Sequence, residues 1–381
     1  MGRFGSGGRG VGLARRRLLQ VTGGGAVALA SAAAGWPRSA GAVSGRVRWL
    51  SPRGSVEVLD DYAYWVAKKF GYFGEIETTL EPGPMQEIVP LELVAQGQAE
   101  VGFPPPRVFA LALERELPLV SVWQMGAYDV FDLAFRQGGR PADLKALAGK
   151  TILLGSAGWQ AIVAPLLKQA GVDPASVSYA EAGNGWGQAL KEGQGDAALS
   201  WEGLRAQWQG QGLEFDYILG REFSKFPANS FVIRRGDFAD PGKDPLYEGY
   251  LRGWAMGLEF GHLNPRAATH LVLEQFPALA ETLTPAVATT SLMQLANVFR
   301  GDWESRRGWG WHDLAQWRRF FATIRELGQI SRPIAPPAVI SNKYVPAANR
   351  FDRQKVATDA SSYQLPPEFE TVDVEAIATR L

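Results

Sequence analysis

Two patterns of apolar residues alternate along most of the chain. Short apolar runs bounded by glycine or polar residues predict buried strands, and longer segments with apolar positions three or four apart predict helices. The predicted strands are 46–50, 75–80, 100–103, 119–125, 130–135, 151–154, 177–180, 197–200, 216–219 and 230–234. The predicted helices are 61–70, 86–96, 108–116, 160–170, 186–192, 202–209, 246–261, 266–275, 285–299 and 314–328. Strands separated by helices indicate parallel α/β layers.

The order of these elements predicts an α/β fold with two lobes and a helical C-terminal part. A second strand–helix series begins near Pro141 and resembles the first, and a return strand at 230–234 leads into consecutive helices. Three prolines, at 333, 336 and 337, predict an irregular final arm. We therefore expect a leader at 1–42, the first part of lobe 1 at 46–136, lobe 2 at 137–228, the return and helical part at 229–330, and an arm at 331–381.

The first 42 residues have the features of an export signal. Arg15, Arg16 and Arg17 precede an uncharged Gly/Ala-rich run, and Ala40-Gly41-Ala42 is a small-residue cleavage site. Paired arginines, a weakly apolar centre and such a site are typical of a twin-arginine signal. The run is too short and too rich in glycine for a permanent membrane helix. The sequence therefore predicts export, with the periplasm as the destination.

Composition narrows the possible chemistry. Six of the 39 basic residues lie in the predicted signal, so the remaining 33 face 39 acidic residues. This balance argues against nucleic acid as a partner. The chain has no cysteine and only three histidines, His262, His270 and His312, none at the spacing of a helical metal site. We expect no disulfide, no metal or other cofactor and no catalytic residue.

Ligands of open parallel sheets lie beyond the carboxyl ends of the strands. In lobe 2 each of three predicted strand ends is followed by a tryptophan among small or polar residues, and an indole offers a flat apolar wall with one N–H donor. The candidates are Ser156, Trp159, Asn184, Trp186, Trp201 and Glu202. Each also has a structural interpretation: the tryptophans as core, Ser156 as a helix N-cap, Asn184 as a turn residue, and Glu202 as an acid in the first turn of a helix.

The corresponding loops of lobe 1 add four candidates. Ser51 and Arg53 follow the first predicted strand. The planar guanidinium of Arg53 could form two parallel hydrogen bonds to one anion. Tyr62 and Tyr128 are further candidates for the wall of the cleft. We expect Asp60 and Asp61, just before the first helix, to cap it.

Five segments resemble the solute-binding proteins of ABC importers for nitrate, sulfonates, taurine and pyrimidine thiamin precursors, the NMT1/THI5-like family. Each segment is weak alone, but their order and spacing together carry the resemblance. They are Ala67-Lys68-Lys69-Phe70-Gly71-Tyr72-Phe73, the helix–strand unit 93–102, Asp143-Leu144-Lys145 with Gly149-Lys150, Ala189-Leu190-Lys191-Glu192-Gly193 with Asp196-Ala197-Ala198, and Asn349-Arg350-Phe351-Asp352.

The resemblance implies a type II periplasmic binding fold in which two lobes close over one small molecule. It implies an inner-membrane permease and its ATPase as partners, and a monomer suits lobe closure. Since tryptophans follow the strands of lobe 2, we expect a planar aromatic or heterocyclic solute; nitrate, an alkanesulfonate or taurine is the alternative. A periplasmic sensor would need the same closing cleft. The fungal synthases of the family use cysteine and histidine chemistry, which argues against an enzyme here.

Overall fold

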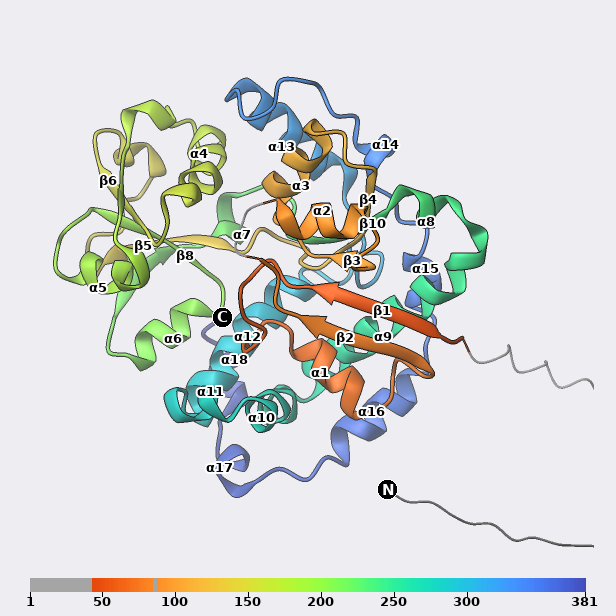
Figure 1. Ribbon diagram of the computed structural model, residues 1–381. Coiled ribbons are helices and arrows are strands. Elements are labelled where there is room, and N and C mark those ends of the chain that lie inside the picture. The colour runs from red at the N-terminus through yellow and green to blue at the C-terminus, as the bar shows by residue number, and fades with distance from the viewer. Residues whose placement is uncertain (1–42, 85–87) are drawn as a thin grey trace, which may run out of the picture. The chain divides into compact units, whose positions relative to one another are not determined.

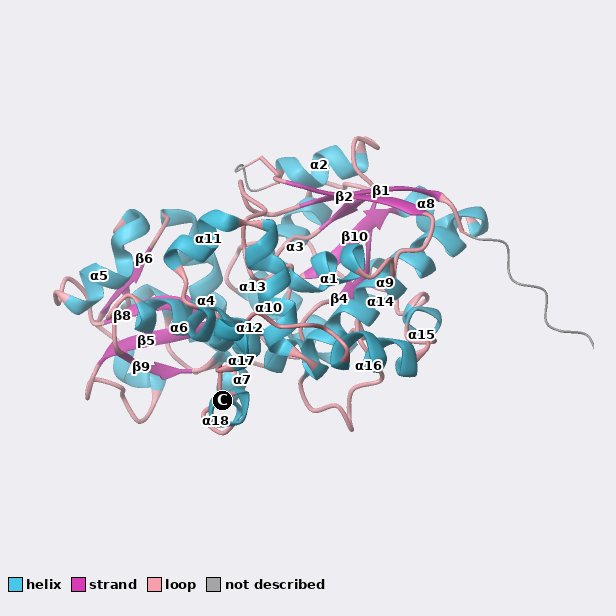
Figure 2. Ribbon diagram, turned by 90° about the horizontal axis from the view of Figure 1, so that it is seen from below, coloured by secondary structure: helices cyan, strands magenta, loops and turns pink. Residues whose placement is uncertain are grey.

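The computed structural model describes residues 43–84 and 88–381. The predicted export signal therefore lies outside the described residues. The described strands form two separate sheets, each covered by helices, which we call lobe 1 and lobe 2 after the order in which the chain enters them (Figures 1 and 2). This mixed α/β architecture with two lobes confirms the predicted fold class.

The sheet of lobe 1 has the order β2-β1-β3-β10-β4. β1 pairs in parallel with β2 and β3, whereas β10 runs antiparallel to both of its neighbours, β3 and β4. The strands are β1 (Gly45–Leu50), β2 (Ile76–Glu81), β3 (Val101–Gly102), β4 (Leu119–Gln124) and β10 (Ser230–Arg234).

The sheet of lobe 2 has the corresponding order β7-β6-β8-β5-β9. β6 pairs in parallel with β7 and β8, and β5 runs antiparallel to β8 and β9. The strands are β5 (Phe131–Arg136), β6 (Thr151–Leu154), β7 (Ser178–Glu181), β8 (Ala197–Trp201) and β9 (Phe215–Ile218). In Figure 1 this sheet lies at the left, with α4, α5 and α6 around it.

Two segments connect the sheets, residues 125–130 between β4 and β5 and residues 219–229 between β9 and β10. Their positions correct two expectations. β5 belongs to the second sheet, so the chain leaves lobe 1 before residue 131 and not at 137. The sheets are mixed and not wholly parallel, because each contains a strand that enters after a crossover and runs against its neighbours.

Helices follow most of the strands and then make up the rest of the chain. Those in the strand-containing part are α1 (Tyr62–Lys69), α2 (Val89–Ala95), α3 (Pro106–Glu114), α4 (Gln160–Gln169), α5 (Trp186–Lys191), α6 (Leu204–Gly210), α7 (Gly220–Phe223) and α8 (Arg235–Ala239). Those that follow are α9 (Asp244–Leu263), α10 (Pro265–Gln275), α11 (Pro277–Thr282), α12 (Pro285–Arg300), α13 (Leu314–Glu326), α14 (Pro336–Val339), α15 (Val345–Ala348), α16 (Arg353–Ser361), α17 (Pro367–Glu370) and α18 (Val374–Ala378).

The predicted irregular arm is wrong, because α14 to α18 occupy it. Val345, Val356 and Phe369 from these short helices are buried in the largest apolar cluster of lobe 1. In α14, α15 and α17 the prolines stand in the first helical turn, where proline is tolerated. Among the described helices, none combines the length and the apolar character that crossing a membrane requires.

The period of two along each strand explains the core of lobe 2. Ile152 and Leu154 of β6 are buried in one apolar cluster with residues of α4, whereas Leu153 between them is buried in the cluster on the other face. Both faces of the sheet are therefore covered, which is why the strands read as continuous apolar runs.

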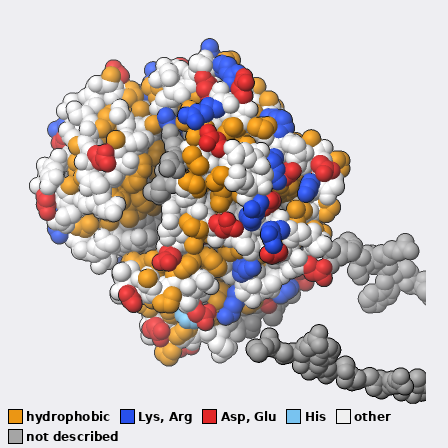
Figure 3. Space-filling model, viewed as in Figure 1, with side chains coloured by type: hydrophobic (Ala, Val, Ile, Leu, Met, Phe, Trp, Pro, Cys, Tyr) orange, Lys and Arg blue, Asp and Glu red, His pale blue; other side chains and the backbone are white. Residues whose placement is uncertain are grey.

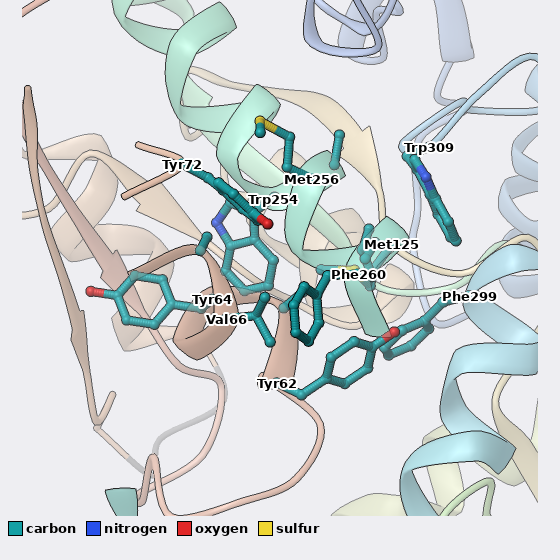
Figure 4. Packing of buried hydrophobic residues seen from close by; sticks show 14 of the residues in the cluster. Tyr62, Tyr64, Val66, Tyr72, Met125, Trp254, Met256, Phe260, Phe299 and Trp309 are labelled. Carbon is teal, nitrogen blue, oxygen red and sulfur yellow. The ribbon is translucent and has the colours of Figure 1, made fainter. Parts of the chain in front are cut away.

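The core of lobe 1 is rich in aromatic rings from α1, α9 and the sheet. Figure 4 shows Tyr62 beside Phe299 at the edge of this cluster, with their ring centroids 6.3 Å apart and the planes 19° from parallel. Trp254 of α9 lies near Trp49 of β1 and Phe231 of β10, at centroid distances of 6.1 and 4.9 Å. The long helix α9 thus packs against one face of the first sheet and buries it.

Side-chain amides also join the lobes. Gln294 of α12 accepts hydrogen bonds from the backbone N–H groups of Gly203 and Ala206, at 3.1 and 3.3 Å, and so caps α6 from another part of the chain. Gln207 of α6 donates to Ser291 of α12 at 3.1 Å. The helical C-terminal part therefore holds the end of β8 in place.

Candidate functional site

Three loops of lobe 2 meet at one edge of its sheet. β7, β6 and β8 are adjacent and parallel, so their carboxyl ends lie side by side. Trp159 and Trp186 lie in the connections that follow β6 and β7, Trp186 as the first residue of α5, and Trp201 is the last residue of β8. The topology therefore brings the three tryptophans together, as the strand-end rule requires.

The three indoles pack against one another. The Trp186 and Trp201 rings are stacked, with centroids 5.8 Å apart and planes 23° from parallel. The Trp159 ring stands nearly perpendicular to both, at 5.4 Å from Trp186 and 5.7 Å from Trp201. Such stacked and edge-to-face pairs are favourable for aromatic quadrupoles and fix the rings relative to one another. We call Trp159, Trp186 and Trp201 the tryptophan trio.

Burial differs within the trio. Trp186 is 9% exposed and its indole N–H donates to the carbonyl oxygen of Leu199 at 2.8 Å, so this ring is an anchor. Trp159 and Trp201 are only half-buried and keep ring surface available. In Figure 3 hydrophobic side chains gather on lobe 2 where it borders the rest of the molecule. Trp186 thus fits the structural interpretation as a core residue, whereas Trp159 and Trp201 are partly open.

A glycine makes this arrangement possible. A Cβ atom on Gly155 would lie 2.7 Å from two carbon atoms of the Trp159 ring and 3.2 Å from Cε3 of Trp186. These distances are shorter than van der Waals contact, so only a residue without a side chain lets Trp159 cross the end of β6.

The polar candidates in these loops are placed differently from one another. Ser156 is half-buried at the start of its short helical turn, yet its hydroxyl makes no capping hydrogen bond. Asn184 is exposed in the loop before α5. Both lie at the same edge of the sheet as the tryptophan trio, because their loops follow adjacent strands.

Glu202 needs a correction, since it is fully buried. Its carboxylate pairs with Arg205 at 2.5 Å and lies 3.8 Å from the guanidinium of Arg221. Arg205 also lies 3.5 Å from the carboxylate of Asp132, which accepts from the backbone N–H of Gly220 at 2.8 Å. Burial and the neighbouring Glu202 raise the pKa of Asp132 well above its usual range. Glu202 therefore belongs to a buried charge network between the strands and the second crossover.

Arg53 also differs from expectation. Its guanidinium lies 2.5 Å from a carboxylate oxygen of Asp61 and 3.5 Å from one of Asp60. Burial alone would lower the pKa of Arg53, but the two carboxylates outweigh it and raise that pKa. Asp61 stands before α1 without a capping hydrogen bond, so the expected cap is wrong and the residue is an ion-pair partner instead. Both terminal nitrogen atoms of the Arg53 guanidinium are thus already paired with carboxylates.

Ser51 is buried and shapes the same loop. Its hydroxyl donates to the carbonyl oxygen of Ser55 at 3.3 Å and accepts from the N–H of Arg53 at 3.1 Å. These contacts hold the turn after β1. The hydroxyl of Ser51 is therefore engaged within its own loop.

The two tyrosine candidates lie away from the trio. Tyr62 is fully buried against Phe299, which leaves it no surface for a solute and corrects the prediction; burial raises the pKa of its phenol. Tyr128 is half-buried in the first crossover, and its hydroxyl accepts from the backbone N–H of Asp302 at 3.1 Å. It lines a different hollow, described below.

The described residues hold no group of three or more His, Cys, Asp or Glu side chains that could bind a metal ion. His312 is buried, with its ring nitrogens 2.8 Å from Ser121 Oγ and 3.0 Å from Asn342 Oδ1. Burial lowers its pKa to about 3, so the ring is neutral. His312 is therefore a structural hydrogen-bonding residue.

Comparison with known families identifies the central part of the chain. A family model described as NMT1/THI5 like matches residues 60–243. This segment is similar to the NMT1/THI5 like family. The match covers the tryptophan trio and both crossovers, and it confirms the resemblance found in the sequence motifs. Comparison with curated protein sequences gives no match.

Solved structures share the fold at low sequence identity. The alkanesulfonate-binding protein SsuA from Xanthomonas axonopodis pv. citri, bound to MOPS, is 14% identical over 78% of this chain and 98% of its own, with a TM-score of 0.55. The periplasmic aliphatic sulphonate binding protein SsuA from Escherichia coli is 13% identical over 78% and 92%, with a TM-score of 0.56. The desulfurization enzyme DSZB is 13% identical over 80% and 98%, with a TM-score of 0.52. One fold thus carries both binding proteins and an enzyme.

The sequence analysis did not identify several residues that organise the end of β8 and its surroundings. Asp132 is flanked by apolar residues in a predicted strand, which signals a buried charge but gives no partner. Its neighbours Arg205 and Arg221 lie on α6 and α7. Gln294, which caps α6, is distant in sequence and lies outside the family match. Only the tertiary structure brings these residues together.

Proposed function

We propose that this protein is the periplasmic solute-binding component of an ABC importer. In this proposal it captures one small molecule between its lobes by hinge closure and releases it unchanged to an inner-membrane permease that works with an ATPase. The fold and the family match support a solute-binding role, and the two crossovers are natural hinges. The export signal expected at residues 1–42 suits such a location.

We propose a planar aromatic or heterocyclic solute. The observation that carries this proposal is the tryptophan trio, with two half-buried rings supported by an anchored third at the ends of adjacent strands. Ligand sites are largely apolar, with few polar groups that orient the ligand. Because the Arg53 guanidinium is already paired with Asp61, it is not free to hold a small inorganic anion, so nitrate is less well supported as the solute.

The direct test is titration of the purified protein by calorimetry with a panel of aromatic acids, pyrimidines, alkanesulfonates and nitrate. Trp159→Ala and Trp201→Ala should each weaken binding of the preferred aromatic solute by about 2 kcal/mol or more, as expected for central aromatic contacts. Trp303→Ala is the matched control, because Trp303 is half-buried like these two residues but packs near Trp309, in the connection between α12 and α13.

Binding of nitrate or alkanesulfonates alone, unchanged in both tryptophan variants, would refute the aromatic solute. Conversion of the solute during incubation would instead support an enzyme, as in the structural neighbour DSZB. A sensor role would leave the binding results unchanged and would show as binding to a signalling partner in place of a permease.

A further inference from the structure

A second hollow lies beside the first crossover. It has a volume of about 430 Å³ and is formed by residues 124–128 together with the segment from 302 to 316 and Asn342. This volume is ample for a small organic molecule. The tryptophan trio contributes no residue to its lining.

Hydrogen bonds make the inner wall of the hollow rigid. Gln124 donates to Gln316 at 3.1 Å and accepts from the indole N–H of Trp317 at 2.8 Å. Gln316 donates in turn to the carbonyl oxygen of Ala127 at 3.2 Å. The amide of Asn342 is bonded to His312 through both its oxygen and its nitrogen. These polar side chains already have partners.

Arg306 is the exception in this wall. Its Nη2 donates to the carbonyl oxygens of Gln124 and Met125, at 3.0 and 3.2 Å, which fixes the plane of the guanidinium. Its Nε and Nη1 are buried and have no hydrogen-bond partner. Within residues 43–84 and 88–381, no carboxylate forms an ion pair with it. A desolvated charge without a counter-ion is unfavourable.

The acids at the rim do not fill this role. Asp313 is exposed and accepts from the N–H of Ala315 at 2.8 Å, where it caps α13. Asp302 is exposed and accepts from the N–H of Glu304 at 3.2 Å. The exposed Arg307 also lines the hollow, and its guanidinium lies over the Trp311 ring at 5.1 Å. The net charge of the lining favours a single negative charge over two.

We propose that this hollow binds a small organic monoanion, a carboxylate or a sulfonate, as the counter-ion of Arg306. Arg307 and the Tyr128 hydroxyl, which can still donate its proton, would contact the ligand from the open side. The charge of Arg306 would attract it from the inner wall. Desolvation lowers the pKa of Arg306 to about 9, which is consistent with a charge that lacks a carboxylate partner. The site is separate from the proposed solute cleft and does not depend on it.

Calorimetric titration of the full-length protein with sodium acetate, sodium methanesulfonate and sodium sulfate tests this site. We expect saturable binding of at least one of the two monoanions, and weaker binding of sulfate. Arg306→Gln, whose amide can still donate to the two carbonyl groups, should weaken monoanion binding at least about tenfold, because charge-assisted contacts are the strong ones. Arg318→Gln, an exposed position on α13, should leave it unchanged.

Two further variants keep the test decisive. If Arg306→Gln fails to fold, Tyr128→Phe decides, because it removes one hydroxyl and should weaken monoanion binding several-fold. Trp159→Ala should reduce binding of the aromatic solute but not of the monoanion, which separates this site from the cleft. The proposal would be overturned if neither monoanion binds saturably, or if folded Arg306→Gln binds the monoanion as tightly as the wild type. Loss of monoanion binding in Trp159→Ala would also overturn it.

Discussion

Replacing Gly155 with alanine should disrupt the tryptophan trio without removing any of its rings. The added Cβ would lie 2.7 Å from Cη2 and Cζ3 of Trp159, where ordinary contact begins at 3.4 Å. The shortfall is about 0.7 Å against a rigid ring, and the same atom would lie 3.2 Å from Trp186. The Trp159 ring must therefore shift, which changes its packing against the other two rings.

The expected cost has two parts. Overpacking of a well-packed site typically lowers the free energy of unfolding by about 1–3 kcal/mol. Displacement of Trp159 also removes one wall of the proposed solute site, and loss of one aromatic contact of about 1.4 kcal/mol corresponds to a tenfold rise in Kd. Both effects follow from one methyl group, so they should appear together.

Near-ultraviolet circular dichroism, chemical denaturation and calorimetric titration would measure these effects. The matched control is Gly158→Ala in the same loop, since its Cβ would meet only the Ser156 Oγ, at 3.9 Å. Gly155→Ala should change the aromatic dichroism and weaken solute binding, whereas Gly158→Ala should change neither. Equal spectra and equal affinities for the two variants would refute the proposed role of the trio.

Three further predictions concern stability. Gln294→Ala should lower the free energy of unfolding by about 1–3 kcal/mol, because two N–H groups at the start of α6 lose their acceptor; the exposed Gln209→Ala is the control, and equal denaturation midpoints would contradict the prediction. Arg53→Ala should lower the free energy of unfolding by about 3 kcal/mol or more, because it leaves the buried Asp61 charge unpaired. The additional change Asp61→Asn should restore much of this free energy. If denaturant titrations show no such recovery, the ion pair does not stabilise the fold. Burial raises the pKa of Asp129 to about 6, above its unfolded value, so the folded state holds the carboxyl proton more tightly. The contribution of this proton to the free energy of unfolding is therefore lost as the pH rises from about 4 to 6. The free energy of unfolding, measured across this pH range, should decrease less for Asp129→Asn than for the wild type. Identical pH profiles would contradict the assignment.

The sequence predicted the strands and helices well where their apolar pattern is regular. The strands 151–154 and 230–234 agree with the structure to the residue. The direction of each strand relative to its neighbours was harder to predict from the sequence. An apolar run such as β5 has the same pattern whether it pairs parallel or antiparallel. The helices after residue 331 were missed, since each is short and begins at or near proline or a polar cap, and burial rather than propensity stabilises them.

The candidate site was predictable to the extent that backbone topology decides it. The three tryptophans lie at or just after the ends of adjacent strands, so the strand-end rule places them together whatever their rotamers. Arg53 and Glu202 were misjudged because ionic partners depend on tertiary contacts. Asp61 lies eight positions after Arg53 at 2.5 Å, and Arg221 is distant from Glu202 in the sequence. A charged residue in a loop therefore predicts a charge but not whether its partner is a solute or a neighbour.

The central claim is that the tryptophan trio forms a wall of the solute site. Hydrogen–deuterium exchange of the purified protein, with and without a saturating solute from the calorimetric panel, tests it most directly. We expect slower exchange at residues 155–159, 182–186 and 201–203, with no comparable change around the exposed Leu263. Saturation that leaves exchange in all three loops unchanged would contradict it.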